Sequence, residues 1–129
     1  MRSEAINTES APSGRGNYSQ AIVAGNLVFC SGTVGLDPAT GQWPDGVEAQ
    51  TVQALKNLSS VLVAAGSSMA LCVKVTVFLT DAAHGAVVNE IYRRHMPDPP
   101  PARSAPVVSG FPVPEALISI DAIATREGS

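Results

Sequence analysis

The sequence predicts an α+β fold in which two helices cover one face of a mixed six-stranded sheet. Apolar runs typical of strands occur at 21–32, 71–80 and 116–125. Two segments with helical apolar spacing separate them, and glycines and prolines stand between the segments. A weak first strand around Ala5-Ile6-Asn7 and another at 104–109 bring the sheet to six strands.

A hairpin is expected near the N-terminus. Residues 21–32 divide into two short strands at Gly25 and Asn26, a dipeptide that tolerates the positive backbone angles of a tight turn. A loop rich in turn-forming residues follows over 36–46.

The first helix is expected over 47–65. Its apolar residues recur at spacings of three and four, which predicts a single buried face, and Gly66 provides a stop. The residues assigned to this face are Val52, Leu55, Leu58 and Leu62.

The strand at 71–80 is rich in β-branched residues and carries one charge, so we expect it inside the sheet. Asp81 is positioned to cap a second helix over 82–95, which the prolines from Pro97 onward end. The residues expected to face the sheet from this helix are Ala86, Val87, Ile91 and Met96.

Length and charge limit the classes of function. The 129 residues predict a single domain over 1–129. A formal net charge of −3 and only eight Lys plus Arg argue against nucleic acid as a partner. The sequence shows neither an apolar stretch long enough to span a membrane nor a signal-peptide pattern, which predicts a cytoplasmic protein without a membrane partner.

The two cysteines, Cys30 and Cys72, lie inside apolar strand-like runs. In a reducing compartment they are better interpreted as small buried apolar side chains than as a disulfide or a nucleophile. The spacing of cysteines and histidines does not suggest zinc, and no metal or cofactor is predicted.

Two helices cannot cover both faces of a sheet. Because charged residues make up only 15% of the chain, we expect the second face to pack against other copies of the chain. A homo-oligomer is therefore predicted.

Arg103 is the first candidate for recognition of an anion. It follows a proline tract and lies at the expected start of a strand. A guanidinium can hold a small carboxylate through two parallel hydrogen bonds, a geometry that lysine cannot supply. The alternative is an ordinary surface salt bridge.

Six short motifs, in this order, resemble the Rid/YjgF family of reactive-intermediate deaminases, also called the endoribonuclease L-PSP type. The resemblance covers nearly the whole chain and implies a cytoplasmic homotrimer with a chorismate-mutase-like fold. The motifs are Gly16-Asn17-Tyr18-Ser19-Gln20-Ala21, Val28-Phe29-Cys30-Ser31-Gly32, Val73-Lys74-Val75-Thr76-Val77-Phe78-Leu79-Thr80-Asp81, Val88-Asn89-Glu90-Ile91-Tyr92, Pro101-Ala102-Arg103-Ser104 and Ile120-Asp121-Ala122-Ile123-Ala124.

The resemblance implies one ligand site in each cleft between neighbouring subunits. Arg103 would bind the carboxylate of a small 2-imino or 2-oxo acid there. Tyr18 and Ser31 would line the same cleft, Asn89 would reach it from the adjoining subunit, and main-chain groups near Ala105 would face the ligand. The implied reaction is hydrolysis of a 2-imino acid to a 2-oxo acid and ammonia, without a metal or cofactor.

Two of these residues have equally simple structural interpretations. Tyr18 is either a hydrogen-bond donor that assists proton transfer or an aromatic lid packed over the cleft. Ser31, which precedes Gly32, either positions a water molecule or ends a strand.

The last strand departs from the family pattern. Deaminating members carry a glutamate that is thought to orient the attacking water, and Ser119 stands at that position here. Asp121, two residues further on, points to the same side of the strand and carries a shorter carboxylate than glutamate. Asn17 and Gly85 also depart from the family pattern, in ways that predict a reshaped or more open cleft.

Three functions therefore compete. The first is a 2-imino acid deaminase that uses Arg103, Tyr18, Ser31, Ser119 and Asp121. The second is a non-catalytic homotrimer that binds small 2-oxo acids or regulates a partner, because Ser119 replaces the water-orienting glutamate. The third, an endoribonuclease, has little support, since the chain lacks a basic stripe with interleaved aromatic residues.

Overall fold

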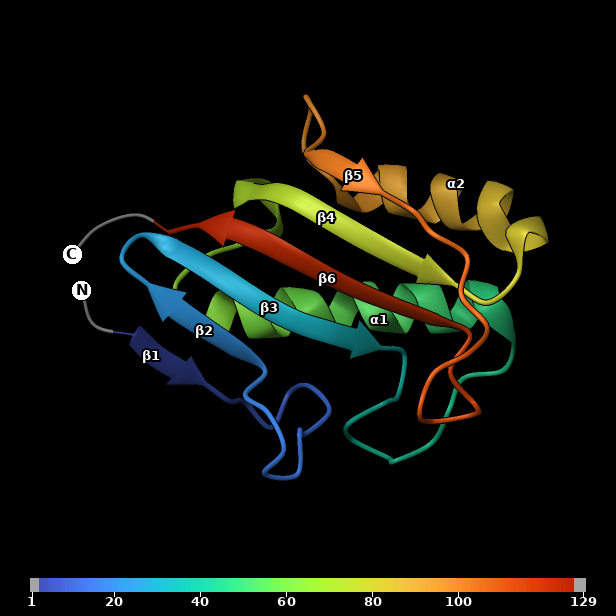
Figure 1. The fold of residues 1–129 in the computed structure, drawn as a ribbon, viewed down its shortest axis with the longest axis horizontal. Helices are drawn as coiled ribbons and strands as arrows, with labels where there is room; N and C mark the ends of the chain where they lie inside the picture. Colours follow the sequence, from blue (N-terminus) through green and yellow to red (C-terminus); the bar gives the residue numbers. More distant parts are fainter. Residues whose placement is uncertain (1–2, 127–129) are drawn as a thin grey trace.

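The computed structural model describes residues 3–126 and confirms the α+β class. One six-stranded sheet has the order β1-β2-β3-β6-β4-β5, and helices α1 and α2 lie behind it (Figure 1). The strands are β1 (Ser3–Ile6), β2 (Ala21–Ala24), β3 (Leu27–Val34), β4 (Cys72–Leu79), β5 (Ala102–Ser104) and β6 (Ile118–Thr125). The helices are α1 (Gly46–Ala64) and α2 (Gly85–His95), with 3₁₀ turns at Met69–Leu71 and Ala82–His84.

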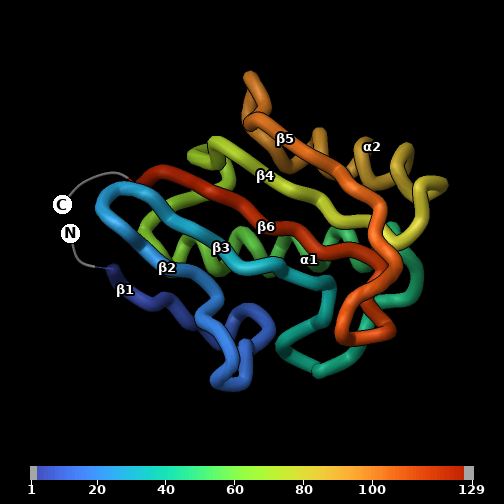
Figure 2. Tube along the Cα trace, in the orientation of Figure 1, coloured from blue at the N-terminus to red at the C-terminus, as the bar shows by residue number. Residues whose placement is uncertain are grey.

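Strand β6 is the last in sequence and lies near the middle of the sheet. It pairs antiparallel with β3 on one side and with β4 on the other, so it joins the two halves of the chain (Figure 2). The only parallel pair among the named strands is β4 with β5. Strand β4 is interior, as its β-branched composition predicts, whereas β1 and β5 form the sheet edges.

The core lies between the sheet and α1. Leu55, Leu58 and Leu62 are at most 1% exposed, which confirms the predicted apolar face of the helix for these three residues. The assignment of Val52 to that face is wrong, since its side chain is 45% exposed. Thr51 and Ala54 are buried instead, because the helix turns its 51–54–58–61 side toward the sheet.

The predicted buried face of helix α2 is confirmed in part. Ile91 is buried and Val87 and Met96 pack against the core, as predicted, whereas Ala86 is exposed. Val88 and Tyr92 complete the buried face. Val88 lies three residues before Ile91 and four before Tyr92, so the three side chains share one side of the helix. Asp81 caps this region as expected, with its carboxylate accepting from the backbone N–H of Ala83 in the preceding 3₁₀ turn.

The strand expected at 104–109 is shorter and begins earlier. Strand β5 covers only Ala102–Ser104, and beyond it the chain touches the sheet through a single bridge between Leu79 and Val107. Pro106 has no N–H to donate, so the pairing cannot continue as a regular ladder. Arg103 is consequently the middle residue of a three-residue edge strand.

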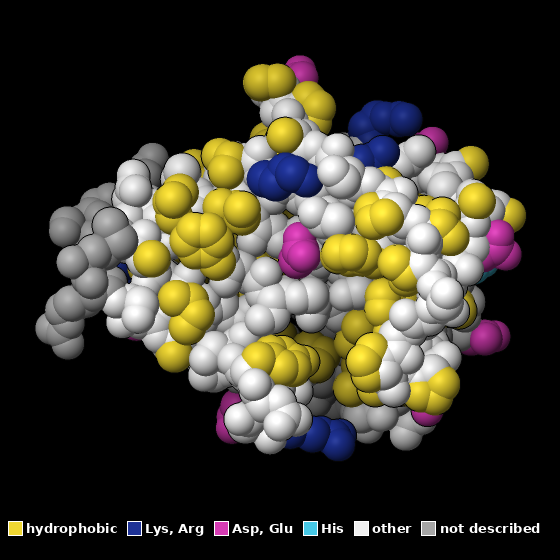
Figure 3. Space-filling view, viewed as in Figure 1, with side chains coloured by type: hydrophobic (Ala, Val, Ile, Leu, Met, Phe, Trp, Pro, Cys, Tyr) yellow, Lys and Arg dark blue, Asp and Glu magenta, His cyan; other side chains and the backbone are white. Residues whose placement is uncertain are grey.

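The face of the sheet away from the helices is open. Phe29, Ile22 and Val73 are 42%, 36% and 47% exposed there, and hydrophobic side chains gather on the same view of the molecule (Figure 3). Within residues 3–126, none of the helices combines the length and the apolar character needed to cross a membrane.

Candidate functional site

Arg103 is held by α2. Its Nη1 donates a hydrogen bond of 2.8 Å to Oδ1 of Asn89, and its guanidinium carbon lies 4.8 Å from the centre of the Tyr92 ring. Asn89 and Tyr92 are three residues apart, so they present one face of the helix to the guanidinium. Arg103 pairs in register with the buried Val75, which directs its side chain toward the helical layer.

The contact with Asn89 lies within one chain. In the single chain Asn89 contacts Arg103 of its own copy, whereas the sequence-based prediction had Asn89 reach the cleft from the adjoining subunit. Helix α2 runs beside β5 in the same copy, so the two residues would enter any cleft between subunits together (Figure 1).

A groove of about 590 Å³ opens beside this guanidinium. The apolar part of its wall comes from Met96 and the prolines after α2, and the polar part from Arg103, Asn89 and Tyr92. An apolar wall with one cationic end suits a small carboxylic acid whose remaining atoms are apolar. The lining residues are Asn89, Tyr92, Arg93, Met96, Pro97, Asp98, Pro100, Pro101 and Arg103.

The hydroxyl of Tyr92 is buried and has no hydrogen-bond partner among the described residues. Burial raises the pKa of Tyr92, and the positive charge of Arg103 offsets part of that rise. The phenol therefore stays neutral near pH 7, and its ring faces the guanidinium through a cation–π contact.

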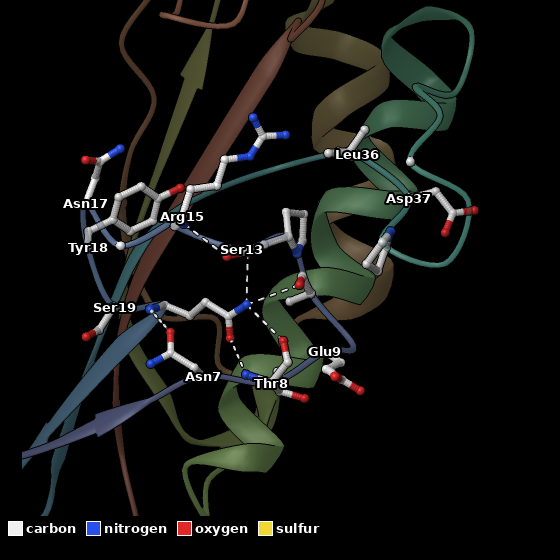
Figure 4. A pocket seen from close by; sticks show the side chains of 17 residues that line it. Asn7, Thr8, Glu9, Ser13, Arg15, Asn17, Tyr18, Ser19, Leu36 and Asp37 are labelled. Atoms are coloured by element: carbon white, nitrogen blue, oxygen red, sulfur yellow. Dashed lines mark hydrogen bonds between the residues drawn. The ribbon is translucent and has the colours of Figure 1, made fainter.

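Tyr18 belongs to a different part of the molecule. It stands on the loop before β2, is 52% exposed and lines a cavity of about 750 Å³ with Arg15, Asn17 and Asp37 (Figure 4). An exposed aromatic ring at a cavity mouth leaves both predicted roles open, a hydrogen-bond donor or a lid.

Gln20 fixes the base of this loop. Its Nε2 donates to the carbonyl oxygens of Thr8, Ala11 and Pro12, and its Oε1 accepts from the N–H of Thr8 at 2.7 Å. These bonds tie the first loop to the start of β2. Gln20 is only 5% exposed, so breaking them would leave a buried amide without partners.

Ser31 connects the Tyr18 loop to β3. Its hydroxyl donates a hydrogen bond of 2.8 Å to the carbonyl oxygen of Ser19, next to Tyr18. Strand β3 does not end here, since it continues to Val34. The interpretation of Ser31 as a strand end is therefore wrong, and the serine instead anchors the segment that carries Tyr18.

Ser119 and Asp121 point to the side of β6 away from the helices, where Ser119 is only 8% exposed and Asp121 is partly exposed. They alternate with Ile118, Ile120 and Ala122, which are buried in the core on the other face. The register of β3 against β6 shifts between Cys30 and Thr33, so Ser31 and Gly32 together lie opposite Asp121. A Cβ added to Gly32 would lie 2.8 Å from Oγ of Ser119, so this glycine makes room for the serine side chain.

The predicted site residues thus form two groups in one chain. Arg103 and Asn89 lie at the β5 edge on the helical side, which we call the anchor corner. Tyr18, Ser31, Ser119 and Asp121 lie on the Tyr18 loop and along β3 and β6, which we call the loop face. Ala105 is exposed two residues after Arg103 and belongs to the anchor corner.

The cysteines are not reactive groups of either region. Burial raises the pKa of Cys30 to about 12, with Cys72 and Asp121 adding to the rise, and burial raises the pKa of Cys72 to about 11. Both thiols are therefore protonated near neutral pH and pack as small apolar side chains. Within residues 3–126, no cluster of three or more His, Cys, Asp or Glu side chains is placed to hold a metal ion.

Comparison with known proteins agrees with this fold. The family model described as Endoribonuclease L-PSP matches residues 8–126. Reactive Intermediate Deaminase A, chloroplastic, from Arabidopsis thaliana is 47% identical over 97% of this chain and 67% of its own length. The 2-iminobutanoate/2-iminopropanoate deaminase of Rattus norvegicus is 42% identical over 94% of this chain and 88% of its own length.

Two solved structures extend the comparison to three dimensions. RidA from the Antarctic bacterium Psychrobacter sp. PAMC 21119 superposes with a TM-score of 0.90 at 38% identity, covering 95% of this chain and 98% of that one. E. coli TdcF with bound serine gives a TM-score of 0.90 at 36% identity, covering 96% and 99%. The chain belongs to the endoribonuclease L-PSP family, the Rid/YjgF group that its motifs resemble.

Two structural residues of the site received no role from the sequence. Tyr92 supports the guanidinium of Arg103, and Gln20 supports the Tyr18 loop. Both stand inside the motifs that carry the resemblance. The available signal was an amphipathic side chain at helical spacing from buried apolar residues for Tyr92, and a polar side chain directly before an apolar strand for Gln20.

Proposed function

We propose that this protein hydrolyses 2-imino acids to 2-oxo acids and ammonia in clefts between the subunits of a homotrimer. The observation that carries the proposal is the guanidinium of Arg103, held by Asn89 and Tyr92 at the edge of a groove. A relative named for 2-iminobutanoate and 2-iminopropanoate and a neighbour with bound serine support a small carboxylate as the ligand.

The arrangement of the two groups favours a site made by two copies. Three strand positions separate β3 from β5, or about 14 Å at about 4.8 Å per strand. Arg103 also faces the helical side, whereas Ser119 and Asp121 face the open side. A three-carbon acid spans only about 4 Å, with C–C bonds of about 1.5 Å. It cannot contact both groups in one chain, so the loop face of one copy must meet the anchor corner of another.

The open sheet face supplies a surface for this assembly. Its exposed apolar side chains, including Phe29 and Val73, would be covered by neighbouring copies. A trimer would bring β5 and α2 of one subunit against the Tyr18 loop of the next and close the groove beside Arg103.

The chemistry requires little of the protein. The carbon of the C=N bond is already electrophilic, so water adds to it, and cleavage of the C–N bond then releases ammonia and leaves the 2-oxo acid. Arg103 holds the carboxylate in place, which converts the attack into a reaction between positioned groups. Tyr18 donates a hydrogen bond toward the reacting nitrogen, and Asp121 accepts one from the attacking water.

Because Ser119 stands where deaminating relatives have a glutamate, Asp121 would act as the base that accepts a hydrogen bond from the attacking water. A serine hydroxyl orients water without supplying negative charge, whereas the Asp121 carboxylate can supply it from the same face of β6. Ser119 and Asp121 together therefore take over the function of one longer carboxylate.

A coupled assay tests the proposal. An amino-acid oxidase generates 2-iminopropanoate from alanine, and semicarbazide traps the imine that remains. The protein should accelerate loss of the imine over buffer and over an equal amount of heat-treated protein. An unchanged rate would refute the deaminase function.

A non-catalytic binding protein is the second candidate, and the serine at position 119 is the observation that favours it. In that case 2-oxobutanoate should raise the melting temperature of the protein while imine hydrolysis stays at the buffer rate. RNA cleavage that follows the protein peak through purification would instead support the activity in the family's description.

A further inference from the structure

Arg15 has an unusual backbone conformation. It is the only non-glycine residue with a positive φ in the described part of the chain, at 53°. The left-handed region is unfavourable for a side chain with a Cβ, so the surrounding loop must hold it there. The N–H of Arg15 donates to Oγ of Ser13 at 3.0 Å, and the N–H of Asn17 donates to the carbonyl oxygen of Gly14 at 3.0 Å.

The loop conformation also requires Gly14. A Cβ at this position would collide with the carbonyl oxygen of Tyr18, so the chain folds back on itself across residues 14–18. Through this tight turn, the positions of Arg15 and Tyr18 are coupled. Ser31 holds the next residue, Ser19, and so connects the turn to β3.

The side chain of Arg15 lines the same cavity as Tyr18. In Figure 4 its guanidinium extends toward the side of the cavity where Leu36 lies. The ion pairs of residues 3–126 join Arg93 to Glu90 and Arg126 to Glu4, so Arg15 is in neither. Glu9 and Asp37 line the same cavity beyond ion-pair distance, and the guanidinium is left available to a ligand.

We propose that Arg15 recognises a second carboxylate on the substrate, so that the preferred substrates are 2-imino and 2-oxo dicarboxylic acids. The inference rests on the proposed cleft, in which Tyr18 of one copy faces Arg103 of another. Arg103 binds the carboxylate next to the reacting carbon, and Arg15 binds the one at the far end of the side chain. Each guanidinium offers the paired N–H donors that a carboxylate accepts.

The anchor corner has room for such a side chain. Gly85 stands one helical turn before Asn89 and on the same face of α2. A Cβ at Gly85 would meet no atom within 4 Å. Gly85 does not line the groove beside Arg103, but the groove itself, at about 590 Å³, is larger than 2-iminopropanoate requires.

Binding of two acids of equal chain length tests the inference. Isothermal titration should show that 2-oxoglutarate binds the wild-type protein about tenfold more tightly than 2-oxopentanoate, which lacks the second carboxylate. The Arg15→Gln variant should bind both acids with equal affinity. Arg15→Lys should retain part of the difference. The three side chains all have a Cβ, so the backbone at position 15 is under similar constraint in each variant.

Kinetics provide a second readout. Arg15→Gln should lower kcat/KM about tenfold for 2-iminoglutarate, made from L-glutamate by L-glutamate oxidase, and change it less than twofold for 2-iminopropanoate. Equal affinities of the wild-type protein for the two oxo acids, or an equal loss for both in Arg15→Gln, would overturn the inference. If the binding preference is present and neither imine is hydrolysed faster than in buffer, the inference stands and the deaminase proposal fails.

Discussion

The anchor corner and the loop face are built in different ways. In the anchor corner, the guanidinium of Arg103 is bonded to Asn89 and lies over Tyr92, a residue only 6% exposed. In the loop face, Tyr18 is 52% exposed and Arg15 has a strained backbone angle. A single chain therefore organises the surroundings of Arg103 in advance. In the proposed trimer, the exposed ring of Tyr18 would be covered only when another copy packs against it.

Replacing Arg103 should have the largest effect. Arg103→Ala removes two proposed charge-assisted hydrogen bonds to the ligand, worth about 1.5–3 kcal/mol each, so kcat/KM for 2-iminopropanoate should fall by about 10²- to 10⁴-fold. Arg93→Ala is the matched control, because Arg93 lines the same groove and is 76% exposed. Equal activity in the two variants would remove Arg103 from the site.

Asp121 should matter next, since it supplies the only carboxylate of the loop face in this proposal. Asp121→Asn keeps the size of the side chain and removes its negative charge, so kcat should fall about 10- to 100-fold with little change in KM. Ser119→Ala, on the same face of β6, should lower kcat less than fivefold, or about 1 kcal/mol. The reverse ranking would assign the water to Ser119.

A glutamate at position 119 tests whether the loop face can use a longer carboxylate. Ser119→Glu should raise kcat about tenfold, because it returns a long carboxylate to the loop face. Ser119 is only 8% exposed and its Oγ already fills the space beside Gly32, so the melting temperature of the variant must be measured together with kcat. A drop in kcat at an unchanged melting temperature would show that the cleft of this protein does not use a glutamate there.

Asn89 tests whether the anchor corner is organised in advance. Asn89→Ala removes the 2.8 Å bond to Arg103 and should raise the dissociation constant for 2-oxobutanoate about tenfold, equivalent to the 1.4 kcal/mol of one hydrogen bond. Asn89→Asp keeps an acceptor and should bind the acid better than Asn89→Ala if the residue acts through Arg103. If Asn89 instead contacts the ligand carboxylate directly, the aspartate variant should be the weaker one.

The hydroxyl of Tyr92 should have the smallest effect. It is buried without a partner among residues 3–126, so Tyr92→Phe removes an unpaired polar group and should leave stability unchanged or raise it by up to about 1 kcal/mol. Tyr92→Leu removes the ring beneath Arg103 and should weaken binding of 2-oxobutanoate. A marked loss of melting temperature in Tyr92→Phe would indicate a partner for the hydroxyl in the assembly.

The regular elements were predictable from local pattern. The hairpin at Gly25 and the stop at Gly66 follow from turn and capping chemistry, and the structure places both where expected; Asp81 caps the 3₁₀ turn Ala82–His84, and α2 itself begins three residues later than predicted, at Gly85. Val52 and Ala86 were assigned to the wrong faces. Apolar spacing alone does not say which side of a helix the sheet will cover, and small or polar residues such as Thr51 can fill the buried side.

The candidate residues themselves came from the sequence, whereas their grouping did not. Arg103, Asn89, Tyr18, Ser31, Ser119 and Asp121 were all named from motifs. The face toward which Arg103 points depends on its register with Val75 in a parallel pair, and the position of Ser31 depends on a β-bulge. Neither the register of this parallel pair nor the β-bulge can be recognised from the sequence of one strand alone.

By itself, the sequence determined the α+β class, the family and the residue types available for chemistry, because periodicity and short motifs are local properties of a chain. Only the tertiary structure decided that Arg103 is held by α2 of its own chain and that Ser119 and Asp121 lie on the other face of the sheet. That division arises from the order of strands, since β6 returns to the middle of the sheet while β5 forms its edge. Contacts between distant segments are set by packing of the whole core, which no short stretch of sequence encodes.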